Sequence, residues 1–121
     1  TEGSPIDICG AVRLNGAPSL RVTRWDLERD VNILNNGHTI QVNMISNNPM
    51  TDVGTLHATV GRGSSGAIQW VLEQVHFHWG RTGLTNEGSE HYVQGRRFPL
   101  EAHFVHYNPA YGPSVSRAVA S

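Results

Sequence analysis

Two histidines separated by one residue, His76 and His78, have the spacing that lets a β-strand present both imidazoles on one face. Val75, Phe77 and Trp79 would then lie on the opposite, apolar face. Two neutral imidazole nitrogens held by a rigid strand are typical zinc ligands. The spacing therefore favours a metal site, with ordinary core or surface histidines as the alternative.

A catalytic zinc ion commonly has three protein ligands, so we looked for a third imidazole. His103 is the best candidate, because it lies on the next strongly extended run, where Glu101, His103 and Val105 share one face. If this run pairs antiparallel with the strand of His76 and His78, the three imidazoles converge.

Two further side chains have the spacing of supporting residues. Gln74 precedes His76 by two residues and Glu101 precedes His103 by two, so each lies on the same face as its histidine. Each can accept the ring proton on the nitrogen that does not bind the metal, which fixes the tautomer and the orientation of the ring. We therefore expect Gln74 and Glu101 to support the two histidines.

Alternating and β-branched patterns predict the strands that would position these residues. The predicted strands cover residues 20–22, 31–34, 39–44, 55–60, 67–78 and 98–107, with an Asn-Asn-Gly turn at 35–37. Residues 1–19 should wrap over the surface, and residues 61–66 and 81–90 should be loops. No apolar period of 3.6 residues persists over several turns, so we expect a mainly β domain with at most short helical turns and no internal repeat.

The length of 121 residues predicts one domain with a single core, which we assign to residues 1–121. Hydrophobic residues make up 38% and charged residues 16%, as in an ordinary globular protein. A formal net charge of -1 gives no basis for binding nucleic acid or an anionic membrane. No apolar run is long enough to span a bilayer, so we expect no membrane insertion.

The chain also contains five motifs in a fixed order. They are Ser-Pro-Ile-Asp-Ile at 4–8, Asn-Asn-Gly-His at 35–38, His-Phe-His-Trp-Gly at 76–80, Gly-Ser-Glu-His at 88–91 and Glu-Ala-His-Phe-Val-His-Tyr-Asn at 101–108. Together they resemble the signature of the α-class carbonic anhydrases, and the resemblance covers essentially the whole chain. It implies a mixed, largely antiparallel sheet of the α-carbonic anhydrase type, and a zinc-dependent reversible hydration of carbon dioxide to bicarbonate and a proton.

The resemblance implies a zinc ion held by three ligands and their hydrogen-bonded support: ligands His76, His78 and His103, and supporting residues Gln74, His91 and Glu101. It also implies that His38 carries protons between the site and buffer, a role suited to an imidazole because its unperturbed pKa lies near neutrality. On position alone, His38 is interpreted as an exposed turn histidine. Glu90 would orient a threonine hydroxyl beside the metal, and Val105 would line the apolar pocket for carbon dioxide.

Members of the resembled family are considerably longer than this chain. The part without a counterpart would supply the threonine beside Glu90, a backbone acceptor for His78 and several central strands, so we expect an incomplete core and an uncovered sheet edge. We expect the sequence to be a portion of a longer protein. The alternatives are a naturally shortened zinc-binding structural or interaction module without catalysis, and a short enzyme that completes its site across an oligomer.

The single Cys9 cannot form an internal disulfide. The resemblance implies a cysteine partner outside this sequence, because secreted members of the family commonly have a disulfide between their two halves. An unpaired buried thiol is the alternative. Cys9 leaves the redox compartment open, and we favour a secreted location slightly over a cytoplasmic one.

Overall fold

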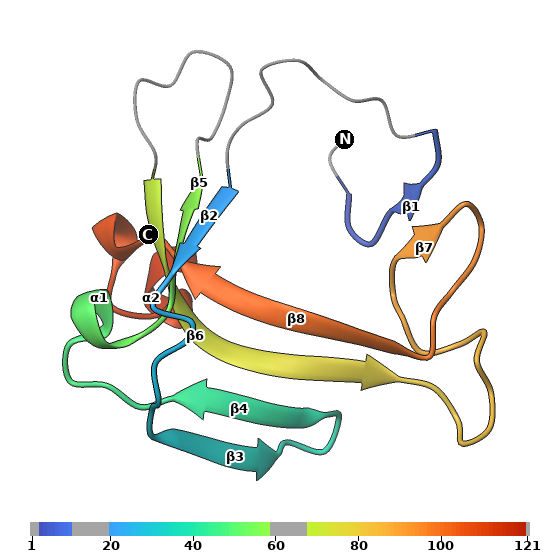
Figure 1. The fold of residues 1–121 in the computed structure, drawn as a ribbon, viewed down its shortest axis with the longest axis horizontal. Helices are drawn as coiled ribbons and strands as arrows, with labels where there is room; N and C mark the ends of the chain where they lie inside the picture. Colours follow the sequence, from blue (N-terminus) through green and yellow to red (C-terminus); the bar gives the residue numbers. More distant parts are fainter. Residues whose placement is uncertain (1–2, 11–19, 59–67, 121) are drawn as a thin grey trace.

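The computed structural model describes residues 3–10, 20–58 and 68–120, and Figure 1 shows how its elements are arranged. The strands are β1 (Asp7–Ile8), β2 (Leu20–Thr23), β3 (Val31–Asn35), β4 (Ile40–Met44), β5 (Thr55–Ala58), β6 (Ile68–Trp79), β7 (Tyr92–Val93) and β8 (Leu100–Tyr107). The helical segments are α1 (Pro49–Asp52), the 3-10 turn η1 (Pro109–Tyr111) and α2 (Val115–Val119). The predicted mainly β fold with only short helical turns is confirmed. None of the helices in the described ranges is long and apolar enough to cross a bilayer.

The long strand β6 organises the main sheet. β8 runs along one edge of β6, whereas β5 and then β4 run along the other edge, because residues of β6 that pair with β8 also pair with β5 or β4. β2 extends the sheet beyond β5, β3 extends it beyond β4, and every pairing in this six-stranded sheet is antiparallel. Among the described strands, parallel pairing occurs between β1 and β7, which form a separate two-stranded sheet.

The Asn-Asn-Gly sequence forms the turn between β3 and β4, as predicted. The Gly37 N–H donates to Asn35 Oδ1 at 2.9 Å, and Gly37 has a φ of +90°, which glycine adopts without steric strain. Asn36 Oδ1 accepts hydrogen bonds from the N–H groups of His38 and Thr39, both at 3.0 Å. The turn exposes His38 and buries Thr39.

Two differences from the predicted strands have local causes. β8 begins at Leu100 rather than at residue 98, because the Phe98 N–H donates to Ser89 Oγ at 2.9 Å and Pro99 has no N–H to donate to a ladder. β1 and β7 were not predicted, since two residues are too few to form an alternating pattern. The predicted loop at 61–66, the strand ends at 59–60 and 67, and the predicted wrapping of residues 11–19 lie outside the described residues.

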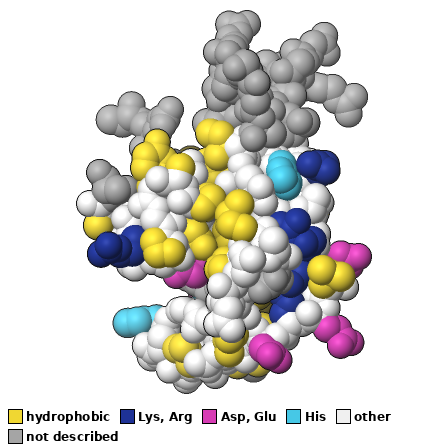
Figure 2. All heavy atoms as spheres, turned by 90° about the vertical axis from the view of Figure 1, so that its left-hand side faces the viewer, with side chains coloured by type: hydrophobic (Ala, Val, Ile, Leu, Met, Phe, Trp, Pro, Cys, Tyr) yellow, Lys and Arg dark blue, Asp and Glu magenta, His cyan; other side chains and the backbone are white. Residues whose placement is uncertain are grey.

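The core of the described residues is small and lies at the end of β6 that is far from the two histidines. Its buried members are Val53, Val71, Leu72 and Tyr107. Met44 packs against the cluster that Val53, Val71 and Tyr107 form. α1, η1 and α2 gather at this end (Figure 1), and Figure 2, which looks onto it, shows hydrophobic side chains at the surface too. Among the described strands β8 pairs only with β6, so its outer edge has no strand beside it.

Candidate metal centre

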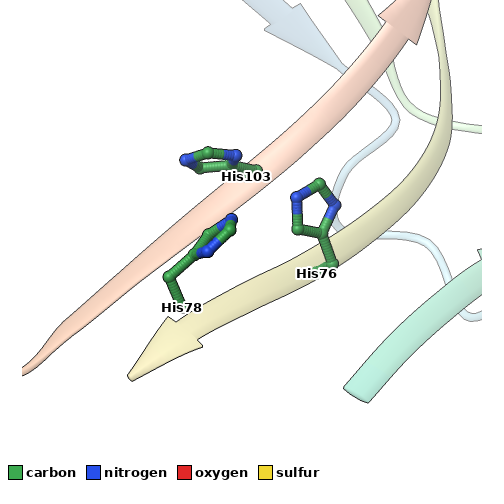
Figure 3. Close-up of side chains that lie close together, drawn as sticks. All are labelled: His76, His78 and His103. Carbon is green, nitrogen blue, oxygen red and sulfur yellow. The ribbon is translucent and has the colours of Figure 1, made fainter. Parts of the chain in front are cut away.

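β6 and β8 bring three imidazoles together. The antiparallel register places His103 opposite His76, and His78 opposite Glu101. The ring centroids are 4.9 Å apart for His76 and His103, 5.2 Å for His76 and His78, and 4.5 Å for His78 and His103. Figure 3 shows the three rings close together, with His76 and His78 extending from β6 and His103 from β8. One nitrogen of each ring lies within 4.8 Å of the chosen nitrogens of the other two, so the three could bind one ion.

The hydrogen bond between His76 and Gln74 selects the tautomer of His76. Nδ1 of His76 lies 2.9 Å from Gln74 Oε1, and an amide oxygen can only accept, so Nδ1 carries the proton and Nε2 keeps its lone pair. Burial lowers the pKa of His76, and the nearby imidazoles of His103 and His78 lower it further, against a smaller opposite effect of Glu90. The neutral imidazole, which is the form that binds a metal, is therefore favoured.

Glu101 supports the histidine trio from β8. Its Oε1 accepts hydrogen bonds from His103 Nε2 at 2.5 Å and from His91 Nδ1 at 2.7 Å, and its Oε2 accepts from the His91 N–H at 2.9 Å. Burial raises the pKa of Glu101, but these hydrogen bonds outweigh burial and lower the pKa to about 2. The carboxylate is therefore charged at neutral pH, which keeps the proton of His103 on Nε2 and leaves Nδ1 with its lone pair.

The third imidazole has no such partner. His78 Nε2 is buried and has no hydrogen-bond partner among the described residues. Glu90 Oε2 lies 3.6 Å from His78 Nε2 and 3.5 Å from His103 Nε2, beyond the length of a good hydrogen bond. A buried polar nitrogen without a partner calls for an explanation such as an ion. With the lone pairs of His76 and His103, it forms a donor set that fits Zn²⁺, which binds imidazole nitrogens at about 2.0–2.1 Å.

The remaining predicted site residues, Glu90, Val105 and His38, make fewer contacts with the histidine trio. Glu90 contacts two of the three rings, but within the described residues it contacts no threonine hydroxyl. Val105 is partly buried and lies opposite Gln74, on the face of the sheet that carries the trio. His38 is exposed on the β3–β4 turn, and its side chain makes no hydrogen bond with another described residue.

Sequence reasoning missed a row of amide side chains that borders the trio on β4. Gln41 lies opposite His76, and Asn43 lies opposite Gln74. Asn36 Nδ2 donates to Gln41 Oε1 at 3.1 Å, and Gln41 Nε2 donates to Asn43 Oδ1 at 2.6 Å. The alternation of this strand predicted a polar side, but only the pairing of β4 with β6 puts that side next to the histidines.

The N-terminal segment approaches the support of the trio. Ser4 Oγ lies 3.4 Å from His91 Nε2, and the Asp7 carboxylate accepts the Gly95 N–H at 3.0 and 3.2 Å. Cys9, in the same segment, is exposed, so the alternative of an unpaired buried thiol is wrong. The predicted pairing of Cys9 with a cysteine outside this sequence stays a prediction.

Residues 1–121 match the eukaryotic-type carbonic anhydrase family. Carbonic anhydrase 6 of Bos taurus is 38% identical over an alignment of 117 residues that covers 93% of this chain and 32% of that protein. Carbonic anhydrase 7 of Mus musculus is 34% identical over an alignment of 122 positions that covers 98% of this chain and 41% of that protein. The carbonic anhydrase-related protein of Homo sapiens is 35% identical over 91 residues, 75% of this chain and 28% of that protein.

The fold and the histidine trio define a mainly β protein with a candidate zinc site. The family match over residues 1–121 shows that the chain belongs to the eukaryotic-type carbonic anhydrase family. The chain spans between 28% and 41% of the length of these three relatives.

Proposed function

We propose that this chain binds one Zn²⁺ ion through His76, His78 and His103. The observation that carries the proposal is the buried His78 Nε2 without a hydrogen-bond partner among the described residues, on a ring whose centroid lies 5.2 Å from that of His76 and 4.5 Å from that of His103. On each of those two imidazoles one nitrogen is already hydrogen-bonded, which leaves the other for a metal. Three protein ligands leave one position of a tetrahedral ion open, as catalysis requires.

The supporting residues hold the ligand rings in this state. Gln74 keeps the proton of His76 on Nδ1, and Glu101 keeps that of His103 on Nε2. His91 donates twice to Glu101 and so fixes the orientation of its carboxylate. These contacts reduce the freedom of the rings before any metal binds.

We further propose that the site serves the reversible hydration of carbon dioxide to bicarbonate and a proton. Bound zinc supplies a Lewis acid that activates water at neutral pH. Glu90 lies beside two of the rings. There it accepts a hydrogen bond from the hydroxyl of a threonine outside this sequence and so orients that hydroxyl at the site. His38, exposed on its turn, passes protons to buffer, and Val105 contributes an apolar wall for carbon dioxide.

A second candidate is a zinc-binding structural or interaction module without catalysis. Two observations favour it: Glu90 contacts no threonine hydroxyl within the described residues, and one relative is named a carbonic anhydrase-related protein. In this case the histidine trio stabilises the sheet through the metal and the substrate steps are absent.

Metal analysis and a carbon dioxide hydration assay on the same preparation separate the two candidates. One zinc per chain with sulfonamide-sensitive hydration supports the enzyme, whereas one zinc without hydration supports the module. Wild-type protein that stays zinc-free after incubation with zinc contradicts both. A His76→Ala variant that retains all its metal contradicts both as well, because it removes a proposed ligand.

We also propose a secreted location, with Cys9 in a disulfide to a cysteine outside this sequence, and no nucleic-acid or membrane partner. Cys9 is exposed and therefore accessible to such a partner, and the formal net charge is only -1. Mass spectrometry of non-reduced protein from its native source tests the disulfide. A free Cys9 thiol in that material contradicts this part of the proposal.

A further inference from the structure

The backbone pairing between β4 and β6 ends at His76, before it reaches His78. Its last pairing is Gln41 opposite His76, one residue before the Phe77 peptide that separates the two strand histidines. The Phe77 N–H donates to Thr39 Oγ1 at 3.1 Å, and Thr39 Oγ1 donates to the Phe77 carbonyl oxygen at 2.5 Å. A hydroxyl can donate and accept at once, so one side chain satisfies both backbone groups of Phe77.

These bonds are shielded from water, because Thr39 is only 8% exposed. Backbone groups removed from water need partners, and leaving one without a partner costs as much as a lost hydrogen bond. The other edge of this segment is paired with β8, where His76 lies opposite His103. A single threonine hydroxyl therefore holds one edge of the segment between His76 and His78, while a complete strand holds the other.

The same threonine belongs to the turn that carries His38. Asn36 Oδ1 accepts from the N–H groups of both His38 and Thr39, and the Asn36 N–H donates to the Thr39 carbonyl at 3.2 Å. Thr39 is the residue directly after His38, so its hydroxyl fastens this turn to β6. The buried Thr39 therefore contacts both the turn that carries His38 and the peptide between His76 and His78.

We propose that Thr39 is a positioning residue, whose hydroxyl fixes the Phe77 peptide and so sets the mutual orientation of His76 and His78. The inference rests on the proposed zinc site. Without the hydroxyl, the Phe77 N–H and carbonyl must rotate toward water or another partner. The two imidazoles are attached to the residues on either side of that peptide, so a rotation there separates their nitrogens and weakens binding of a shared ion.

The test compares three variants. Thr39→Val keeps the shape of the side chain and removes the hydroxyl, and Thr39→Ser restores the hydroxyl. Thr55→Val is the matched control, because Thr55 is fully buried on β5 and its hydroxyl bonds to Thr23 at 2.7 Å and to His57 and Arg24 at 3.3 Å, away from His76, His78 and His103. Three readouts are needed: zinc affinity by competition with a chromophoric chelator, the visible spectrum of the cobalt-substituted protein, and amide hydrogen exchange of metal-free protein.

In Thr39→Val we expect about tenfold weaker zinc binding, at the low end of the effect of supporting residues, together with an altered cobalt spectrum. We also expect the Phe77 amide to exchange at least about tenfold faster, since its acceptor is lost. Thr39→Ser should restore all three readouts to within about threefold of wild type. Thr55→Val should leave zinc affinity and the cobalt spectrum unchanged.

The inference is overturned if Thr39→Val binds zinc as tightly as Thr55→Val, or if Thr39→Ser fails to rescue binding. Failure of the proposed function gives a different result, namely wild-type protein that binds no zinc. In that event exchange at Phe77 and the ring resonances of His76 and His78 in metal-free protein still decide the role of Thr39. Identical exchange and resonances in wild type and Thr39→Val would reject it.

Discussion

The two faces of β6 and β8 differ in how completely their side chains find partners within the described residues. On the polar face, His76 and His103 each have a hydrogen-bond partner two residues away on the same strand. On the apolar face, Trp79, Leu100 and Phe104 are 51%, 56% and 48% exposed. The rings of His76 and His103 are thus held by bonds within their own strands, whereas the apolar face depends on the residues that pack over it.

From this difference we expect that the proposed metal binding and the packing can be changed separately by substitution. Substitutions on the polar face should alter zinc affinity more than the stability of the metal-free protein. Substitutions of apolar residues should alter stability where the residue is buried and little where it is exposed. Each of the four predictions below compares a residue that has close partners with a matched residue that serves as its control.

Neighbouring residues of β8 provide the largest expected contrast. His103→Ala removes a proposed ligand, so we expect zinc affinity to fall by more than about 100-fold, the upper end of the effect of a supporting residue. Phe104→Ala, one residue further on the opposite face, should keep zinc affinity within about threefold. Chelator competition on both variants measures the contrast. Equal zinc affinity in the two would break the division between the faces.

Glu101→Gln should have the next largest effect, because it removes the charge that orients both His103 and His91 while keeping the size of the side chain. We expect zinc affinity to fall about 10- to 100-fold. Glu28→Gln, at an exposed position, is the control for loss of one negative charge. If the two variants lose the same amount in a zinc titration, Glu101 acts only through the net charge of the protein.

A valine pair tests the apolar residues. Val71 on β6 is fully buried between its partners Thr55 and Tyr107, so Val71→Ala should lower the free energy of unfolding by about 2 kcal/mol. Val22 on β2 is 49% exposed, so Val22→Ala should change it by less than about 0.5 kcal/mol. Urea unfolding of the metal-free variants measures both. A comparable loss for both valines would mean that the apolar side chains are packed more evenly than their exposure indicates.

The sequence was sufficient to predict the trio, because period-two alternation places His76 and His78 on one face whatever surrounds them. It also predicted that His103 would lie opposite this pair, since consecutive strong strands commonly pair antiparallel, and the register has His103 beside His76. Gln74 and Glu101 followed from the same alternation. The roles of His38, Glu90 and Val105 came only from the family resemblance and stay predictions.

What the sequence could not predict depends on contacts between distant segments. The hydroxyl of Thr39 bonds to Phe77, 38 residues away, where a ladder happens to end. β1 and β7 pair over two residues each, and Asp7 lies opposite Tyr92 in a register that no local pattern encodes. Such contacts are set by tertiary packing rather than by propensity, so no single segment carries their signal.

The smallest expected effect lies in the loop that follows β6. Glu87 Oε1 accepts from Arg81 Nε at 2.8 Å and from the Arg81 N–H at 2.9 Å, and these hydrogen bonds lower the pKa of Glu87. A carboxyl group whose pKa is lowered by folding stabilises the fold above the ordinary glutamate pKa of about 4.3. This contribution is lost as the pH falls through the lowered value. Because the pair is exposed, the contribution is small.

Glu87→Gln should therefore flatten the decrease in melting temperature between about pH 6 and about pH 3 slightly, relative to wild type. Glu28→Gln, at an exposed position, is the control for removal of one carboxyl group. Thermal unfolding followed by circular dichroism at several pH values measures the three slopes. If Glu87→Gln also weakens zinc binding, the loop that carries both Glu87 and Glu90 helps to arrange the polar face. The hydrogen bonds of Gln74 and Glu101 within β6 and β8 are then not sufficient to arrange the site.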